Sequence, residues 1–252
     1  MNFWLMAAAK YLKAYTMKDC EITILTTRPL AYTTLEKAQA AGVLIDTETF
    51  IETNSIVDQN IAEEIRKYAT ENISVVFTSM NAVEAVIDVL ELDGITPDWT
   101  IYSMGGTTKT IIKNYFAECE LVATSTNSTE LADNIINNEE EEIVFFCGNQ
   151  RRDELPALLK KHSIILNEVT VYETVELPVK VNKQYNGILF FSPSAVRSFF
   201  TANKVAPETV LFAIGSTTAE ALKTASTNKI ITGEFPNKEE LAEKAMAYLS
   251  GL

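Results

Sequence analysis

Histidine, cysteine and positive charge are scarce in this sequence. Its 252 residues include one histidine, His162, so a His-rich metal site is excluded and any Ser-His-Asp or Cys-His catalysis would depend on that residue. The three cysteines, Cys20, Cys119 and Cys147, are too widely spaced for a zinc ligand set or a disulfide framework. This cysteine usage is typical of a reducing compartment, and we predict a cytoplasmic protein that holds no metal.

Basic residues are outnumbered by acidic ones, 21 against 34, which gives a net charge of −13. A nucleic-acid-binding protein needs a basic surface to neutralise phosphates, so this class is excluded. Long apolar runs are also absent, and none approaches the roughly 18 residues of a membrane-spanning helix. The sequence therefore predicts a protein that binds neither nucleic acid nor a membrane.

The first 16 residues are predicted to be a dispensable N-terminal extension. Their short apolar run, Phe3–Ala9, has no basic residue before it and is followed by Lys10 and Lys13, which is the reverse of a signal peptide. The first strand-like segment begins soon after Met17, so we expect the fold to start from there.

Nucleotide-binding and hydrolase motifs are missing as well. The chain has no G-x-G-x-x-G, Gly105–Thr110 lacks the spacing of a P-loop, and there is no G-x-S-x-G nucleophile elbow. His162 ends a predicted helix and Cys147 ends a predicted buried strand, so both are interpreted as structural residues. No cofactor is predicted.

Short β-branched runs alternate with amphipathic helical patterns from Glu21 onward. The strands are apolar on both faces, which is typical of a parallel sheet covered by helices on both sides. Ser192-Pro193 marks a helix start, because a serine N-cap is followed by proline at the first helical position. The predicted fold class is α/β. The expected strands are 22–27, 43–46, 74–78, 101–104, 121–124, 143–147, 164–166, 187–192, 209–214 and 229–232.

The pattern contains an internal repeat. Phe77–Val83 (FTSMNAV) resembles Phe190–Val196 (FFSPSAV), and Ile101–Thr108 (IYSMGGTT) resembles Leu211–Thr218 (LFAIGSTT). Each copy predicts a strand, a serine turn, a helix, a strand, a glycine-threonine turn and a helix. A repeat this long indicates duplicated domains rather than a solenoid. We therefore predict two similar α/β domains.

Two segments of alternating pattern, Glu48–Thr53 and Glu168–Val175, lie on either side of the first copy. If they pair with each other, the chain leaves one domain and later returns to it through a two-stranded connection. The predicted organisation is an extension over 1–16, a discontinuous domain over 17–47 and 176–252, a second domain over 53–167, and a connection over 48–52 and 168–175.

Polar turns follow the predicted strands at their carboxyl ends, where open parallel sheets bind ligands. Glycines allow close backbone approach, and hydroxyls and helix N-termini offer hydrogen-bond donors to anions. Any one of these turns is explained as well by N-capping, but the whole set at strand ends favours a binding site. The candidate binding residues are Thr27, Arg28, Thr78, Ser79, Asn81, Gly105, Gly148, Asn149, Ser192, Ser194, Gly215, Thr217 and Thr218.

Tyr172 lies in the alternating segment Val171–Val175. Its phenol would face either a ligand or plain solvent, and composition alone favours a structural aromatic.

Taken in chain order, these segments resemble uroporphyrinogen-III synthase, a cofactor-free cyclase family of tetrapyrrole biosynthesis. No single motif decides the match, which extends from about residue 20 to the end of the chain. The resemblance implies two Rossmann-like or flavodoxin-like parallel-sheet domains joined by a two-stranded connection. The matching stretches are Phe77–Val83, Gly148, Arg151–Leu155, Val171–Val175, Phe190–Val196 and Ala213–Ala219.

The resemblance also implies a reaction, the closure of hydroxymethylbilane to uroporphyrinogen III with loss of water and inversion of ring D. The resemblance places Tyr172 nearest the role of proton donor for the departing hydroxyl, and a phenol, which is protonated at neutral pH, is able to donate. The substrate carries eight carboxylates, so the turns and Arg28, Arg151 or Arg197 have to bind it despite the net negative charge. No cofactor is implied, and we expect a monomer. The alternative is a non-catalytic two-domain α/β hinge protein that binds a small anionic ligand.

Overall fold

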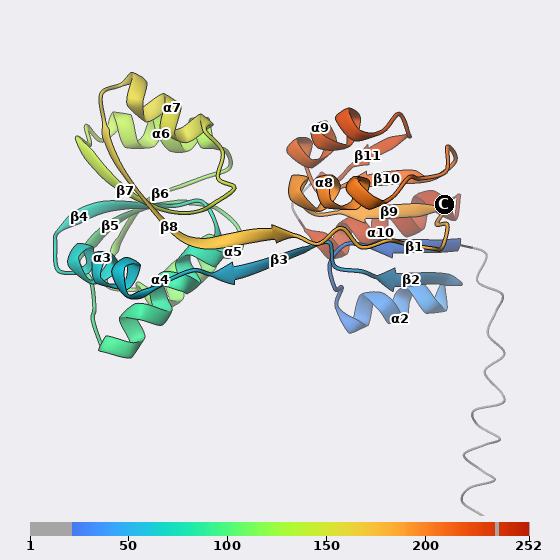
Figure 1. Ribbon diagram of the computed structural model, residues 1–252, viewed down its shortest axis with the longest axis horizontal. Coiled ribbons are helices and arrows are strands. Elements are labelled where there is room, and N and C mark those ends of the chain that lie inside the picture. The colour runs from blue at the N-terminus through green and yellow to red at the C-terminus, as the bar shows by residue number, and fades with distance from the viewer. Residues whose placement is uncertain (1–21, 235–236, 252) are drawn as a thin grey trace, which may run out of the picture. The chain divides into compact units, whose positions relative to one another are not determined.

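A computed structural model describes residues 22–234 and 237–251, and within them the chain forms two compact units (Figure 1). Unit 1 comprises the described residues up to Ile51 and from Glu176 onward, and unit 2 comprises Glu52–Val175. The chain therefore enters unit 2 inside the predicted connecting segment 48–52 and leaves it at the end of the segment 168–175. The expected extension, residues 1–16, lies outside the described residues.

Unit 1 is a parallel sheet with helices on both faces (Figure 1). Its strand order is β11-β10-β9-β1-β2. Apolar residues of α2 and α10 pack on one face of the sheet, and those of α8 and α9 pack on the other. The elements are β1 (Ile22–Thr26), α2 (Tyr32–Ala40), β2 (Val43–Thr47), β9 (Gly187–Phe190), α8 (Pro193–Ala202), β10 (Val210–Ala213), α9 (Ser216–Ala225), β11 (Ile230–Thr232) and α10 (Lys238–Leu249).

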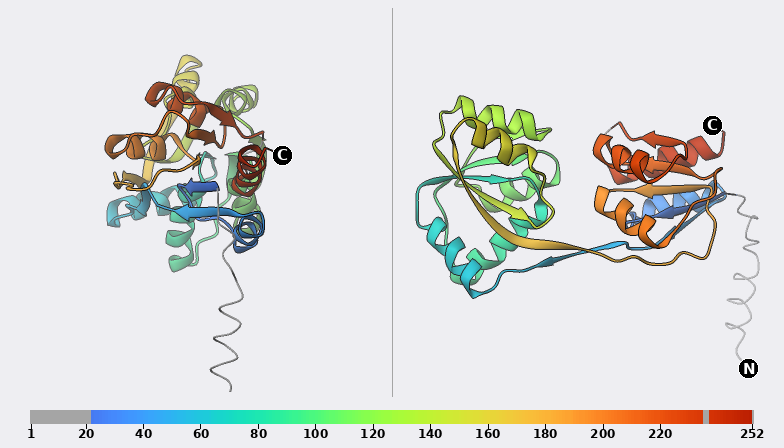
Figure 2. Two further views of the ribbon diagram at one scale, coloured as in Figure 1. Left: turned by 90° about the vertical axis from the view of Figure 1, so that its right-hand side faces the viewer. Right: turned by 45° about the horizontal axis from the view of Figure 1, so that its top comes forward.

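Unit 2 contains a second sheet with helices packed against it (Figure 2). Its strand order is β3-β8-β7-β4-β5-β6. Helices α3, α4 and α5 cover one face, and α6 and α7 cover the other. The elements are β3 (Ile51–Ser55), α3 (Gln59–Ala69), β4 (Ile73–Phe77), α4 (Met80–Asp93), β5 (Trp99–Met104), α5 (Thr107–Tyr115), β6 (Glu120–Ser125), α6 (Ser128–Asn137), β7 (Glu142–Gly148), α7 (Glu154–Lys161) and β8 (Ile165–Glu176). The α/β class and the two parallel-sheet domains predicted from the sequence are confirmed.

The sequence repeat is visible as a structural repeat. In unit 2, β4 leads through Ser79 into α4, and β5 leads through Gly106 into α5. In unit 1, β9 leads through Ser192 into α8, and β10 leads through Gly215 into α9. Each unit thus contains one helix with a serine N-cap and one helix that follows a glycine.

Strand β8 differs from the sequence expectation. A short strand at 164–166 and a separate connecting segment at 168–175 were expected, but β8 is one strand of 12 residues. It pairs with β7 from Ile165 to Tyr172, and β3 lies on its other side. The alternating pattern arises because the strand belongs to the sheet of unit 2 over most of its length.

No helix among the described residues is long and apolar enough to cross a membrane.

The core of unit 2 is built around Phe146. Its ring stacks on Phe77 with a centroid distance of 5.4 Å and lies 5.7 Å from the ring of Trp99. The Trp99 indole N–H donates a 2.9 Å hydrogen bond to the carbonyl of Tyr68, which satisfies its buried polar atom. These side chains join β4, β5 and β7 to α3.

We expect Phe146→Ala to destabilise unit 2 by about 3–5 kcal/mol, because it removes a fully buried ring and leaves a cavity. Urea unfolding followed by tryptophan fluorescence measures this. The chain has two tryptophans, so a Trp4→Phe background leaves Trp99 of unit 2 as the reporter. Leu92→Ala is the matched control, since Leu92 is 86% exposed and its loss should leave the transition in place. An unchanged midpoint for Phe146→Ala would contradict this account of the core.

Candidate active site

The candidate residues lie in turns at the carboxyl edge of each sheet. In unit 2 these turns follow β4, β5 and β7, and in unit 1 they follow β1, β9 and β10. Parallel pairing brings the turns of one unit to one edge, because neighbouring parallel strands end together. Thr27, Gly148 and Thr218 are buried, Arg28, Asn149 and Thr217 are exposed, and the half-buried candidates are Thr78, Ser79, Asn81, Gly105, Ser192, Ser194 and Gly215.

Two of the turns are serine N-caps. Ser79 Oγ accepts a 3.2 Å hydrogen bond from Asn81 N at the start of α4, and Ser192 Oγ accepts one of 3.2 Å from Ala195 N at the start of α8. Ser192 Oγ also lies 3.0 Å from Ser194 Oγ. Capping explains both serines locally. It uses the oxygen as an acceptor only, so capping does not use the hydroxyl proton.

Helices α5 and α9 begin without a side-chain cap. Gly106 precedes α5 with φ 70°, a left-handed conformation that favours glycine, and Gly215 precedes α9 in extended backbone. The first N–H groups of these helices therefore lack a capping side chain and are suited to binding an anion. Gly105, by contrast, donates its N–H to the carbonyl of Ser125 at 2.9 Å.

Lys109 adds a positive charge that no motif in the sequence marks. It lies in the first turn of α5, and its Nζ donates a 3.3 Å hydrogen bond to Thr124 Oγ1 at the end of β6. Only its place directly after the glycine-threonine turn could have singled it out.

The turn after β1 contains one buried and one exposed candidate. Thr27 is 1% exposed, and both its N–H and its hydroxyl donate to the carbonyl of Leu189, at 3.1 and 2.9 Å. Thr27 therefore joins β1 to β9 and has no free donor. Arg28 is exposed, and its guanidinium has no hydrogen bond or ion pair within the described part of the chain.

Helix α10 holds this turn in place. Lys238 Nζ donates a 2.7 Å hydrogen bond to the carbonyl of Pro29. The Glu239 carboxylate accepts a 3.0 Å hydrogen bond from Ala31 N and another from the Thr34 hydroxyl. These bonds cap the N-terminus of α2, because the N-cap residue of that helix, Ala31, has no side chain that could do so. Local sequence signals could not reveal this cap, because its two halves are far apart in the chain.

The other candidate arginines are already bound to carboxylates. Arg151 donates to both carboxylate oxygens of Glu168 and to Asp153, and these partners raise the pKa of its guanidinium. Arg197 Nε donates a 2.9 Å hydrogen bond to Glu176 Oε1. Much of the positive charge of these two side chains is therefore neutralised within the protein.

Tyr172 lies against the end of β7. It is half-buried and packs at the margin of the apolar cluster on the α3–α5 face of the sheet. A Cβ built on Gly148 would lie 2.3 Å from Tyr172 Cζ and 2.7 Å from its hydroxyl oxygen, so the phenol occupies the place of a side chain at that position. The phenol group is thus held at the carboxyl edge of unit 2.

Asn149 and Gln150 extend the pairing of β8 beyond the end of β7. Asn149 N donates to the Tyr172 carbonyl at 3.1 Å, and Asn149 Oδ1 accepts from Thr174 N at 2.9 Å. Gln150 Nε2 donates to the Thr174 carbonyl at 2.9 Å. The amide oxygen of Asn149 therefore supports the strand that carries Tyr172.

Burial raises the pKa of the Tyr172 phenol above its ordinary value. A hydrogen bond with the Ser79 hydroxyl lowers the pKa in part, and the nearby Cys147 thiol raises it. The net direction is upward, so the phenol keeps its proton at neutral pH and can serve as a donor. A Ser79 hydroxyl that donates to the phenol oxygen would also stabilise the phenolate formed when the proton leaves.

Groups suited to other chemistry are either distant from the turns or unreactive. His162 caps the C-terminus of α7 and is exposed, and burial raises the pKa of the Cys147 thiol to about 11, which keeps it protonated. Within residues 22–234 and 237–251, no three His, Cys, Asp or Glu side chains gather as metal ligands.

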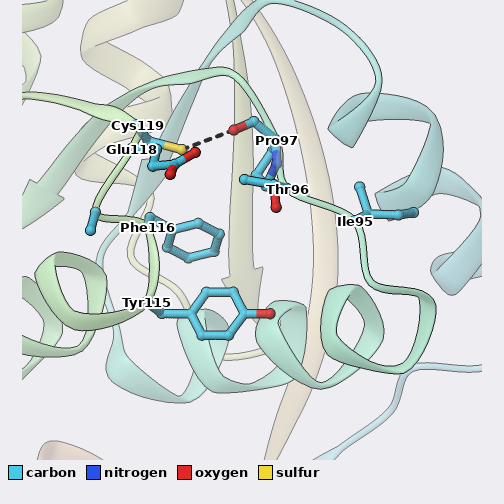
Figure 3. Close-up of a pocket in the computed structure, with 8 residues that line it drawn as sticks. Ile95, Thr96, Pro97, Tyr115, Phe116, Glu118 and Cys119 are labelled. Carbon is cyan, nitrogen blue, oxygen red and sulfur yellow. Dashed lines mark hydrogen bonds between the residues drawn. The ribbon is translucent and has the colours of Figure 1, made fainter.

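A pocket of about 270 Å³ lies at the amino ends of β5 and β6, on the edge of unit 2 opposite to the candidate turns (Figure 3). Cys119 Sγ donates a 3.2 Å hydrogen bond to the Pro97 carbonyl inside it, and burial raises the pKa of this thiol. None of the candidate residues is part of the pocket, whose lining is Ile95, Thr96, Pro97, Tyr115, Phe116, Ala117, Glu118 and Cys119.

Comparison with known proteins gives a consistent result. A family model described as uroporphyrinogen-III synthase HemD matches residues 33–243. A mutant uroporphyrinogen III synthase from the extremely thermophilic bacterium Thermus thermophilus is similar in structure, with a TM-score of 0.66 at 10% identity, covering 91% of this chain and 99% of that one. The Helicobacter pylori 26695 uroporphyrinogen-III synthetase is similar with a TM-score of 0.62 at 16% identity, covering 90% and 99%. At these identities the structures establish a shared fold.

We expect Thr27→Val to lower the free energy of unfolding by about 1 kcal/mol, because it removes a buried hydroxyl donor while keeping the side-chain shape. Thr217→Val is the matched control on an exposed residue and should change stability by less than about 0.5 kcal/mol. Chemical denaturation of both variants measures the difference. Equal effects would show that the Thr27 hydroxyl does not join β1 to β9.

Proposed function

The chain belongs to the uroporphyrinogen-III synthase family, and from this membership we propose how its residues carry out the family reaction. That reaction closes hydroxymethylbilane, a linear tetrapyrrole, to uroporphyrinogen III with loss of water and inversion of ring D. Spontaneous closure tends to give the uninverted isomer. The protein therefore has two tasks, which are to help the hydroxyl leave and to hold the chain so that the substituted carbon of ring D reacts.

Tyr172 is the proton donor in this proposal. The C–O bond of the hydroxymethyl group on ring A breaks, pushed by the ring nitrogen electrons, and the hydroxyl takes the phenol proton and leaves as water. The substituted α-carbon of ring D then bonds to the resulting azafulvene carbon, and the spiro intermediate fragments and recloses with ring D reversed. The ring that regains aromaticity releases one proton, which restores the phenol.

The observation that carries this assignment is the placement of the Tyr172 phenol. It lies over Gly148 at the carboxyl edge of unit 2, within reach of the Ser79 hydroxyl and the N-terminus of α4. Burial keeps the phenol protonated, while the Ser79 hydroxyl and the helix N-terminus both favour the transient phenolate. The site can thus release a proton to the leaving group and recover it within the same cycle.

Substrate carboxylates are bound chiefly by uncharged donors, since the chain itself is at −13. The N–H groups at the starts of α5 and α9, and exposed hydroxyls such as that of Thr217, supply such donors. Among the candidate arginines, Arg28 is the one for which we propose a direct carboxylate contact. Arg151 and Arg197 already bind Glu168 and Glu176, whereas Arg28 has no such partner within the described part of the chain.

The remaining expectations follow the same reasoning. We propose a monomer that does not bind nucleic acid, because its charge is negative and its exposed large apolar side chains come from separate elements. A reducing, cytoplasmic location is supported by Cys119 and Cys147, both of which are free thiols.

We expect Tyr172→Phe to lower kcat for uroporphyrinogen III formation by roughly 10- to 100-fold, the low end for a general acid, because the pyrrole nitrogen already assists the leaving group. The uninverted isomer should rise in proportion, since slower catalysis leaves more substrate to close spontaneously. Separation of the oxidised product isomers measures both effects. Full rate and full isomer purity would show that the proton comes from another donor.

We expect Arg28→Gln to raise KM about tenfold with kcat nearly unchanged, because a charge-assisted hydrogen bond to a carboxylate contributes about 1.5–3 kcal/mol. The loss should shrink as salt is added, since salt screens the attraction in the wild type. Arg66→Gln is the matched control, because Arg66 lies in the last turn of α3 and pairs with Asp93 away from the turns. Equal KM values for the two variants would remove Arg28 from the site.

A further inference from the structure

We propose that Gly148 is a positioning residue for the reaction, because the absence of a side chain there creates the space in which the Tyr172 phenol lies. The inference rests on the proposed role of Tyr172 as proton donor. Gly148 then serves to position the reacting phenol, and not to let the substrate approach the backbone closely.

The contact involves the reactive end of the tyrosine. A Cβ on Gly148 would meet Tyr172 Cζ at 2.3 Å, Cε2 at 2.5 Å and the hydroxyl oxygen at 2.7 Å, all shorter than atoms can approach. By contrast, a Cβ on Gly105, in the turn after β5, would meet only the Ser125 carbonyl at an ordinary 3.6 Å, and one on Gly215 would meet nothing within 4 Å. Of these candidate glycines, Gly148 alone is needed for space.

Backbone conformation does not explain the glycine. Gly42, Gly94, Gly106 and Gly251 have positive φ, a region that favours glycine, but Gly148 does not. An alanine at Gly148 could therefore adopt the same backbone without strain. The constraint on this position is the volume taken by the phenol.

A bulge in β8 brings the ring to this place. Cys147 pairs with Thr170, and the next residue, Gly148, pairs with Tyr172, so Val171 is an extra residue on β8. Val171 and Tyr172 consequently both face the α3–α5 side of the sheet, although consecutive residues of a regular strand face opposite sides. Without the bulge, Val171 would stand beside Gly148.

The main chain on both sides of the bulge is bonded to its neighbours. The Val171 carbonyl accepts from Ile56 N at 3.1 Å after β3, and the Tyr172 carbonyl accepts from Asn149 N at 3.1 Å after β7. The strand therefore cannot move away easily if a methyl group is added at Gly148. The outer end of the Tyr172 side chain can move, so the Gly148→Ala variant should fold with the Tyr172 phenol displaced.

We expect Gly148→Ala to lower kcat about as much as Tyr172→Phe, roughly 10- to 100-fold, with little change in KM and with a matching rise of the uninverted isomer. The double variant Gly148→Ala/Tyr172→Phe should be no slower than either single one, because no hydroxyl remains to be misplaced. A merely structural defect at Gly148 would instead slow the enzyme further in the Tyr172→Phe background.

Two measurements independent of activity accompany the kinetics. In protein labelled with ¹³C at tyrosine Cζ, the resonance lost in Tyr172→Phe should move in Gly148→Ala, because the phenol leaves Ser79 and the β7 end. In thermal unfolding, any loss of stability from Gly148→Ala should vanish in a Tyr172→Ala background, where the ring no longer occupies the space.

The outcomes separate this inference from the proposal on which it rests. If Tyr172→Phe keeps full rate, the role of Tyr172 fails and that of Gly148 fails with it. If Tyr172→Phe is slow but Gly148→Ala is not, or if the double variant is much slower than both, the positioning role alone is overturned. An unmoved Tyr172 resonance in Gly148→Ala would overturn it as well.

Discussion

Most neighbouring strands of the two sheets pair in parallel, and parallel strands end at the same edge of a sheet. This constraint gathers Ser79, Gly105 and Gly148 of unit 2 at one edge although they come from three separate parts of the chain. It also directs the N-termini of α4 and α5 to that edge, because each helix follows its strand there. Strand β8 then carries Tyr172 to the same place, beside the last residue of β7.

In this acidic chain, two of the candidate arginines are paired with the protein's own carboxylates. Glu168 and Asp153 hold Arg151, and Glu176 holds Arg197, so these side chains are oriented but partly neutralised. In the binding mode proposed above, backbone N–H groups and hydroxyls carry much of the recognition beside Arg28, and helices set the directions of the N–H groups. Such donors suit a flexible substrate with many carboxylates, since they select a geometry as well as a charge.

Sequence reasoning succeeded where structure is determined locally. The serine caps at Ser79 and Ser192 and the repeat of strand, turn and helix could be predicted, because capping and periodicity involve residues close in the chain. It could not show that the Thr27 hydroxyl is consumed by Leu189, nor that Glu239 caps α2, because these contacts join distant segments.

The orientation of Tyr172 was beyond sequence reasoning for a related reason. The alternating pattern of Val171–Val175 predicts a regular strand, in which neighbouring residues face opposite sides. A bulge breaks that alternation, and its position depends on how β8 is held between Ile56 and Asn149. Only the paired structure decides which face the phenol shares with Val171.

The discontinuity of unit 1 has a consequence for biosynthesis. As the chain leaves the ribosome, β1, α2 and β2 emerge before unit 2, but two parallel strands and one helix are too small to be stable alone. Unit 2 is one continuous segment, Glu52–Val175, and can complete its core while synthesis continues. The early segment must wait for β9 to pair with β1 and for Glu239 of α10 to cap α2. During that interval its apolar face is open to chaperones and proteases, and α10, which is translated after unit 2, ends that exposure when it packs beside α2.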